Sequence, residues 1–389
     1  MVERSTDSVF WNRVMEANTT HAAGNVHAGM DLVTREGLQQ LTGVRRTPCI
    51  SVFLPTHRAG VAANHCPLCL KSLIRDVEDH LRDQSLPASE IRFLLEPVEG
   101  LTEDHDFWQH QRDGLALFRS HGLFRYYRLP LSLPELAIVG DAFYLKPVLP
   151  LLTADSHFYV VALSWSRARV LVATRDDIDE LGSAAMPARL EAVLREDVPW
   201  QSRRDDGGKE LLDYYQRMNR GLRDLLLRGP APVVLAGTQS LCPVYRQANT
   251  NPELLPEPVS ANPDELDPAE LRKKAARIAA GRFRADRRRA ADQYLQLWHT
   301  QRASNILADI LPAACEGRVH ILFVAAGVQI LGHFNAATNE TILACSPAQE
   351  DRDLMSLAAV WTVATGGRVY AVTPDDVPGR GLVAAVFRY

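Results

Sequence analysis

Short apolar strands alternate with amphipathic helical segments along most of this chain. The clearest strand is residues 48–55, an apolar run with a proline at each end. The clearest helix is residues 209–228, whose apolar side chains recur at steps of three and four residues. This alternation is typical of domains in which helices cover a β-sheet. We therefore predict an α/β fold.

The composition is that of a folded, multidomain protein. The 389 residues are 46% hydrophobic, which is enough for two or three separate cores. Charged residues make up 23% and the formal net charge is -4, which argues against global disorder and against a globally basic nucleic-acid binder. The sequence has no apolar run long enough for a membrane span, and the N-terminal residues lack the apolar core of a signal peptide. Six scattered cysteines do not suggest a disulfide-built fold, so we expect a cytoplasmic protein.

Changes in composition along the chain predict five segments. We expect a lead-in at residues 1–30 and an N-terminal α/β domain at 31–150, which ends in a proline-rich stretch. A middle domain is expected at 151–250. Five prolines predict a linker at 251–268. Residues 269–389, where helices precede further strands, are expected to form a C-terminal α/β domain.

The middle domain has a recognisable order of elements. A hairpin at residues 157–174 is followed by a polar loop at 201–209, which contains Gly207-Gly208-Lys209. The long amphipathic helix comes next, and then the buried strand 233–237. This order resembles the middle domain of archaeo-eukaryotic peptide-chain release factors, in which a Gly-Gly-Gln tip precedes the long helix.

From about residue 31 onward, the chain resembles the bacterial relatives of those factors, the baeRF group. The stretches that carry the resemblance occur in the order 48–57, 107–108, 113–118, 143–147, 235–237, 243–246, 317–319, 366–367 and 386–389. The resemblance implies an RNase-H-like middle domain and a C-terminal domain like the kink-turn RNA-binding proteins. It also implies the ribosome as partner, with rRNA and tRNA as candidate contacts and with no membrane, DNA or cofactor.

The resemblance implies that the loop at 201–209 faces RNA. In the family's release factors, the backbone amide of the tip glutamine helps to stabilise charge as water attacks the peptidyl-tRNA ester. Lys209 keeps a backbone N–H but replaces the neutral amide with a long cation, so we assign no catalytic residue. The alternative is a flexible turn followed by an ordinary surface lysine. The candidate RNA contacts in this loop are Arg203, Arg204, Gly207, Gly208 and Lys209.

A second candidate for RNA contact is a run of cations at residues 272–289, which we call the basic patch. On one or two helices these side chains would form a dense cationic face, and phosphates neutralised there would release counterions. The alternative is a solvated helix whose cations pair with nearby acids. The patch consists of Arg272, Lys273, Lys274, Arg277, Arg282, Arg284, Arg287, Arg288 and Arg289.

Other motifs give weaker indications. Cys66 and Cys69 form one CxxC, which is half of a zinc site, and the sequence has no second CxxC. The nearby histidines fit no known finger spacing, so we predict no metal. The GxSxG, HExxH and Walker motifs of common hydrolases are absent.

These observations favour a ribosome-associated translation factor of release-factor type. The lysine at the tip favours binding at the ribosomal A site in rescue, hibernation or stress protection over normal termination. Two alternatives remain open at this point. One is a peptidyl-tRNA ester hydrolase that uses the same loop, and the other is a non-ribosomal protein-binding module that has kept only the fold.

Overall fold

The computed structural model describes residues 33–44, 47–57, 65–181, 186–199, 208–336, 338–344 and 352–389. The predicted lead-in at 1–30 lies outside these residues. The chain divides into two compact units. The first unit comprises the described residues from Gly43 to Pro147, and the second comprises 33–42 together with the described residues from Val148 onward. The described part of the chain has no helix that is both long and apolar enough to cross a membrane.

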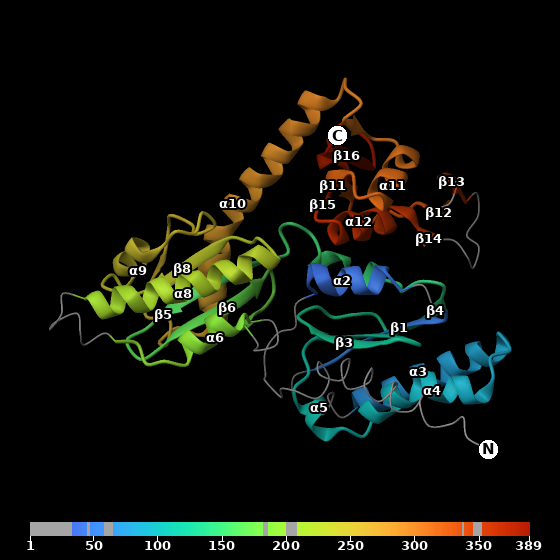
Figure 1. Cartoon of the computed structure of the whole chain (residues 1–389), viewed down its shortest axis with the longest axis horizontal. Coiled ribbons are helices and arrows are strands. Elements are labelled where there is room, and N and C mark those ends of the chain that lie inside the picture. Colours follow the sequence, from blue (N-terminus) through green and yellow to red (C-terminus); the bar gives the residue numbers. More distant parts are fainter. Residues whose placement is uncertain are drawn as a thin grey trace, which may run out of the picture. The chain divides into compact units, whose positions relative to one another are not determined.

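The first unit is built on a four-stranded antiparallel sheet in the order β3-β2-β1-β4 (Figure 1). Its central strand β1 (Cys49–Pro55) pairs with β2 (Gly114–Ser120) on one side and with β4 (Leu136–Gly140) on the other. The outer strand β3 is Leu123–Leu129. The apolar run at 48–55 that the sequence predicted as a strand is β1.

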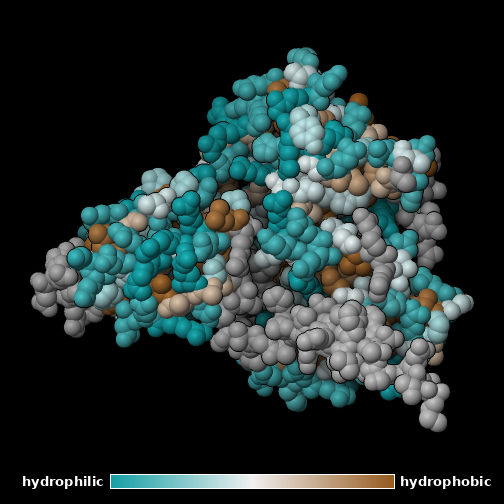
Figure 2. Space-filling view, in the orientation of Figure 1, coloured by the Kyte–Doolittle hydropathy of each residue, from teal (hydrophilic) through white to brown (hydrophobic). Residues whose placement is uncertain are grey.

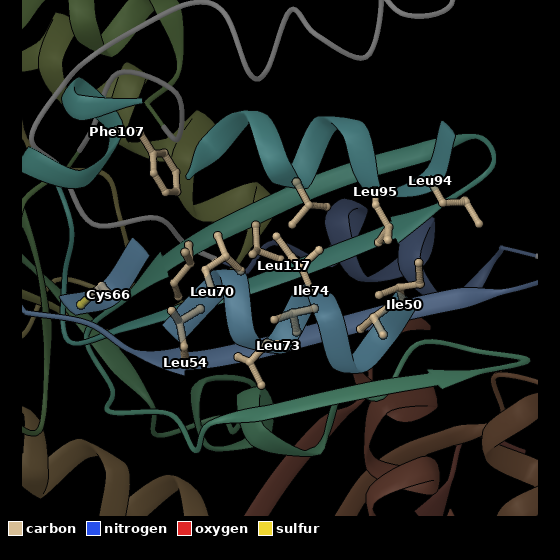
Figure 3. Close-up of a cluster of buried hydrophobic side chains, with 14 of the residues drawn as sticks. Ile50, Leu54, Cys66, Leu70, Leu73, Ile74, Leu94, Leu95, Phe107 and Leu117 are labelled. Atoms are coloured by element: carbon tan, nitrogen blue, oxygen red, sulfur yellow. The ribbon is translucent and has the colours of Figure 1, made fainter. Parts of the chain in front are cut away.

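Two helices, α3 (Cys66–Asp83) and α4 (Ala88–Leu101), cover one face of this sheet. Figure 3 shows Ile50 and Leu54 of β1 facing side chains of these helices. Alternate residues of a strand point to opposite faces, and Phe53 accordingly packs on the other face, edge-on to Phe118. Because both faces are covered, β1 is buried along almost its whole length. The short helix α5 (His105–Gln109) adds Phe107 and Trp108 to the helix-covered face.

The second unit contains a five-stranded sheet in the order β7-β6-β5-β8-β9. Its strands are β5 (His157–Leu163), β6 (Ala168–Thr174), β7 (Ile178–Glu180), β8 (Val233–Gly237) and β9 (Val259–Ser260). The three strands β7, β6 and β5 are antiparallel, whereas β5, β8 and β9 are parallel. The helix α8 (Lys209–Arg228) packs with α6 (Ala188–Leu194) and α9 (Cys242–Ala248).

The segment predicted as a linker is part of this sheet. Val259 is buried, and β9 pairs with β8. Leu255 is also buried, and its backbone N–H donates to the Val233 carbonyl. The five prolines are compatible with this arrangement because β9 is a two-residue strand at the edge of the sheet, where few N–H groups need a partner.

A second sheet of this unit has the order β10-β16-β11-β15. Its strands are β10 (Ala303–Ser304), β11 (Val319–Ala325), β15 (Arg368–Val372) and β16 (Val383–Phe387). The helices α11 (Leu307–Cys315) and α12 (Leu354–Ala364) cover one face. A small sheet in the order β13-β12-β14 is formed by β12 (Leu331–Asn335), β13 (Glu340–Leu343) and β14 (Arg352–Asp353). The α/β class predicted from the sequence is confirmed.

One helix, α10 (Pro268–Leu297), contributes to both of these cores. Leu271, Ala275 and Ala279 in its first half pack against the five-stranded sheet. Ala290 and Tyr294 in its second half pack against the sheet formed by β10, β16, β11 and β15. The sequence predicted separate middle and C-terminal domains, but α10 is continuous between their two sheets, and both sheets lie in one compact unit.

The helix α2 (Arg35–Thr42) belongs to the second unit, although the sequence grouped it with the N-terminal domain. It packs against α12, more than three hundred residues later in the chain. The Gln39 amide donates to the Ala364 carbonyl at 2.8 Å, and Arg35 Nε donates to the same oxygen at 3.3 Å. Both contacts satisfy a carbonyl of the last turn of α12, which has no donor within its own helix.

Candidate nucleic-acid interface

The described part of the candidate loop begins at Gly208. Arg203, Arg204 and Gly207 lie outside the described residues. Gly208 is the residue before the first turn of α8, and its φ of 82° is in the left-handed region. Its carbonyl accepts the first helical hydrogen bond, from the Leu212 N–H at 3.0 Å. A residue with a side chain would be strained in this conformation, which explains why a glycine occupies position 208.

Lys209 is the first residue of α8, and its side chain is exposed. It forms no ion pair with any other described residue. A lysine in the first turn of a helix is unfavourable, because the positive end of the helix dipole lies there. Helix stability therefore does not account for a lysine here. The cation and the free N–H groups of the first turn would together attract an anion such as a phosphate.

The rest of α8 fixes this end in place. The five apolar positions that the sequence predicted for one face are all buried: Leu211, Tyr215, Met218, Leu222 and Leu225. Arg217, on the exposed side, forms two parallel hydrogen bonds with Glu196, at 2.6 and 2.7 Å. The pair between Arg217 and Glu196 joins α8 to a residue that precedes the loop at 201–209 in the sequence.

All nine residues of the basic patch lie on α10, which is a single helix. Four of them have partners among the described residues. Lys274 pairs with Glu270, Arg282 pairs with both Glu253 and Asp286, and Arg289 pairs with Asp286. Arg272 donates to the carbonyl of Arg175. These four cations have partners of the kind that the alternative predicts, and their contact with RNA stays a prediction.

The other five cations form no ion pair with a described residue, and we call them the cationic stripe. Successive residues of an α-helix are turned by about 100° around its axis, so positions 273, 277, 284, 287 and 288 lie within one sector of about 100°. The sector is about 22 Å long, at about 1.5 Å per residue. Figure 2 shows mostly hydrophilic residues over the visible surface of the second unit. The stripe consists of Lys273, Arg277, Arg284, Arg287 and Arg288.

The two candidate RNA contacts are carried by different helices. The helix α8 packs with α6 and α9, whereas α10 packs against the two larger sheets of the second unit. Sequence reasoning also missed two exposed apolar side chains near the end of α10, Leu295 and Trp298. Positions 295 and 298 fall on the same side of the helix as the cationic stripe, and this spacing in the sequence could have revealed them.

The surroundings of Cys66 and Cys69 favour the protonated thiols over the thiolates. Burial raises the pKa of Cys66, and a hydrogen bond to Glu135 raises the pKa of Cys69 to about 11. A zinc ligand must be a thiolate, which both effects disfavour. The described residues contain no group of three or more His, Cys, Asp or Glu side chains placed to hold a metal ion.

The comparisons with known proteins bear on the part of the chain that carries both candidates. Residues 157–318 match the model of "Bacterial archaeo-eukaryotic release factor family 3". The resemblance to the baeRF family is confirmed over these residues. The matched segment contains the five-stranded sheet, the loop at 201–209 and the whole of α10. No curated protein matches the chain.

Several solved structures match this chain at low sequence identity and with low TM-scores. An archaeal translation termination factor, aRF1, is 12% identical, with 92% of this chain and 99% of that chain covered and a TM-score of 0.25. Archaeal Pelota, from a model of ribosome-bound Pelota and ABCE1, is 11% identical over 94% and 98% of the two chains, with a TM-score of 0.41. Dom34 of S. cerevisiae, described as a termination-like factor that interacts with Hbs1, is 10% identical over 69% and 75%, with a TM-score of 0.37.

Proposed function

We propose that this protein is a cytoplasmic, ribosome-associated translation factor of release-factor type. It binds the ribosomal A site in rescue, hibernation or stress protection, and it does not act in normal termination. The observation that carries the proposal is the family match at 157–318, because this segment contains both the loop and the basic patch. On this proposal the two sheets of the second unit are an RNase-H-like domain and a domain like the kink-turn RNA-binding proteins.

The composition of the tip supports binding without ester hydrolysis. Gly207-Gly208 is kept, and the left-handed φ of Gly208 is a backbone that a glycine adopts without strain. The next residue is Lys209 in place of the glutamine of the family's release factors. A lysine side chain has three donors and a full positive charge, which suits a phosphate. It does not offer the neutral amide that would orient a water molecule.

The cationic stripe supports a second contact with RNA. Its five cations have no acidic partner among the described residues, so they are available to neutralise phosphates. Each phosphate contact releases counterions, and the affinity should therefore fall steeply as salt is raised. The net charge of -4 confines this attraction to local surfaces such as α10.

Cosedimentation with ribosomes over a series of salt concentrations tests the proposal. We expect the full-length protein to bind, and a Lys273→Gln, Arg284→Gln double variant to bind more weakly with a reduced salt dependence. Arg92→Gln is the matched control, because Arg92 is an exposed cation on α4 of the first unit. No binding to vacant, translating or starved-cell ribosomes would overturn the proposal in favour of a non-ribosomal protein-binding module.

A peptidyl-tRNA release assay separates binding from hydrolysis. We expect the wild-type protein to release no peptide, and Lys209→Gln is assayed beside it to test whether the glutamine alone restores the reaction. Release by the wild-type protein that is lost in Gly208→Ala, with ribosome binding kept, would instead identify a peptidyl-tRNA hydrolase.

A further inference from the structure

The cationic stripe of α10 ends in exposed apolar side chains. Leu295 is 57% exposed and Trp298 is 37% exposed. Both positions fall in the same sector of the helix as the cations, because they lie 22 and 25 residues after Lys273 at about 100° per residue. Helical backbone angles continue to Trp298, which caps α10. One surface therefore carries five cations followed by an indole ring.

The ring of Trp298 is held in place from one side. Its centroid lies 5.4 Å from that of Tyr294, at an interplanar angle of 43°. Tyr294 is fully buried, and a Cβ atom at Gly379 would lie only 2.6 Å from its hydroxyl oxygen, so the tyrosine is tightly enclosed. Trp298 thus packs on a fully buried neighbour while more than a third of it remains exposed. A ligand that stacks on this ring would find it already ordered.

The acidic residues of α10 do not neutralise the cationic stripe. Glu270 is engaged by Lys274. Asp286 is engaged by Arg282 and Arg289 and lies on the opposite side of the helix from the stripe. Asp292 is exposed but lies beside the sector, about 100° around the helix from Lys273. The stripe therefore keeps an uncompensated positive charge up to the tryptophan.

We infer that this surface binds an unpaired segment of RNA, with the cations on successive phosphates and a base stacked on Trp298. This inference rests on the proposed function and adds to it the kind of RNA recognised. In a duplex the faces of the bases are covered by their neighbours, and an aromatic ring has no free base to stack on. A row of cations beside an exposed aromatic ring is the usual arrangement for single-stranded nucleic acid.

The test is the affinity of the full-length protein for a fluorescently labelled single-stranded RNA and for the same strand in a duplex. We expect the single strand to bind more tightly. Base stacking on an aromatic ring contributes about 1–3 kcal/mol, so Trp298→Leu should weaken single-strand binding by about 5- to 150-fold. It should leave the salt dependence unchanged, whereas Lys273→Gln and Arg284→Gln should each lower the slope by about 0.7.

Two further variants keep the result interpretable. Trp165→Leu is the matched control, since Trp165 is 38% exposed and lies in the turn between β5 and β6, outside α10. Trp298→Phe keeps an aromatic ring and should keep most of the affinity. Thermal unfolding of each variant shows whether it is folded.

The outcomes separate this inference from the proposed function. If Trp298→Leu binds single-stranded RNA and sediments with ribosomes like the wild type, the inference is overturned, while a loss on charge removal still supports the proposed function. Equal affinity for the duplex and the single strand also overturns it. If the wild type binds neither RNA nor ribosomes, the proposed function itself fails.

Discussion

Arg119 is a buried cation whose partners are set by a proline on another element. Pro97 lies inside α4 and has no N–H, so the Phe93 carbonyl lacks its usual helical donor. The Arg119 guanidinium donates to this oxygen and to the Leu94 carbonyl, both at 3.0 Å, and lies 5.0 Å from the centroid of the Phe93 ring. Burial lowers its pKa to about 10, so it stays charged at neutral pH.

We expect Arg119→Met to lower the free energy of unfolding of the first unit by about 1–3 kcal/mol, because the Phe93 carbonyl loses its donor and the Leu94 carbonyl loses its hydrogen bond from the guanidinium. Chemical denaturation monitored by circular dichroism measures the change. The control is Arg92→Met, an exposed site on α4 where no loss is expected. An Arg119 variant as stable as the control would show that the carbonyls find other donors.

His157 makes the second unit sensitive to acid. Burial lowers its pKa from 6.5 to about 4, and its Nδ1 lies 3.0 Å from the Ser156 hydroxyl. Because the folded pKa is depressed, the unfolded chain binds the proton more readily. The stability is complete above about pH 6.5 and is lost as the pH falls towards 4.

We expect the wild type to lose about 1–2 kcal/mol between pH 7 and pH 5 through this group, and His157→Gln to lose less. Urea denaturation at the two pH values gives the comparison. His299→Gln, at an exposed site, should follow the wild type. Identical pH dependence in all three proteins would contradict the role of His157.

Single residues were predictable where the local pattern determines their position. Large apolar side chains favour the core and carboxylates favour the surface, and accordingly Phe107 and Trp108 are buried whereas Asp104 is exposed. Gly366 follows the end of α12 with a φ of 81°, a conformation that glycine favours after a helix. The role of Arg119 was not predictable, because its partners on α4 lie more than twenty residues away in the sequence.

Two glycines in helices illustrate how the surroundings decide the effect of a methyl group. Gly281 is exposed on α10, and a Cβ atom there would have no heavy atom within 4 Å. Gly221 is on α8, where a Cβ atom would lie 2.7 Å from the Leu190 Cα of α6. Gly281 therefore serves no packing purpose, whereas Gly221 allows two helices to approach closely.

We expect Gly281→Ala to raise the free energy of unfolding of the second unit by about 0.5–1 kcal/mol, since alanine loses less backbone entropy on folding. Gly221→Ala is the matched variant and should be destabilising because it forces α6 and α8 apart. Thermal unfolding compares the two, and the same direction of change in both would contradict this account.

Elements with a regular pattern were predictable, and irregular ones were not. The apolar positions of α3 and α8 have helical spacing, and all of them are buried. The helix α4 was missed because it contains Pro97. The segment 251–268 was taken for a linker because its prolines obscure a two-residue strand and a few buried apolar side chains. In the candidate site, the cations were predictable from composition, but their division into paired and unpaired sets depends on Glu253 and other acids placed by the fold.

At the scale of the whole chain, the early helix α2 packs against the late helix α12. Leu38 of α2 is fully buried where this helix packs on α12. We expect Leu38→Ala to lower the stability of the second unit by about 2–5 kcal/mol, with little effect on the first. Hydrogen exchange should be faster in the amides of α12 and unchanged in α3. The control is Gln40→Ala, at an exposed position on the same helix.

The contact between α2 and α12 has a consequence for synthesis of the protein. The ribosome delivers Arg35 329 residues before its partner Ala364. At about 5–20 residues per second, α2 emerges roughly 15–65 s before α12 exists. The strands and helices of residues 43–147 emerge in that interval and can fold in order. The nascent chain therefore holds an amphipathic helix whose buried leucines, Leu38 and Leu41, wait for their partner until the last part of translation.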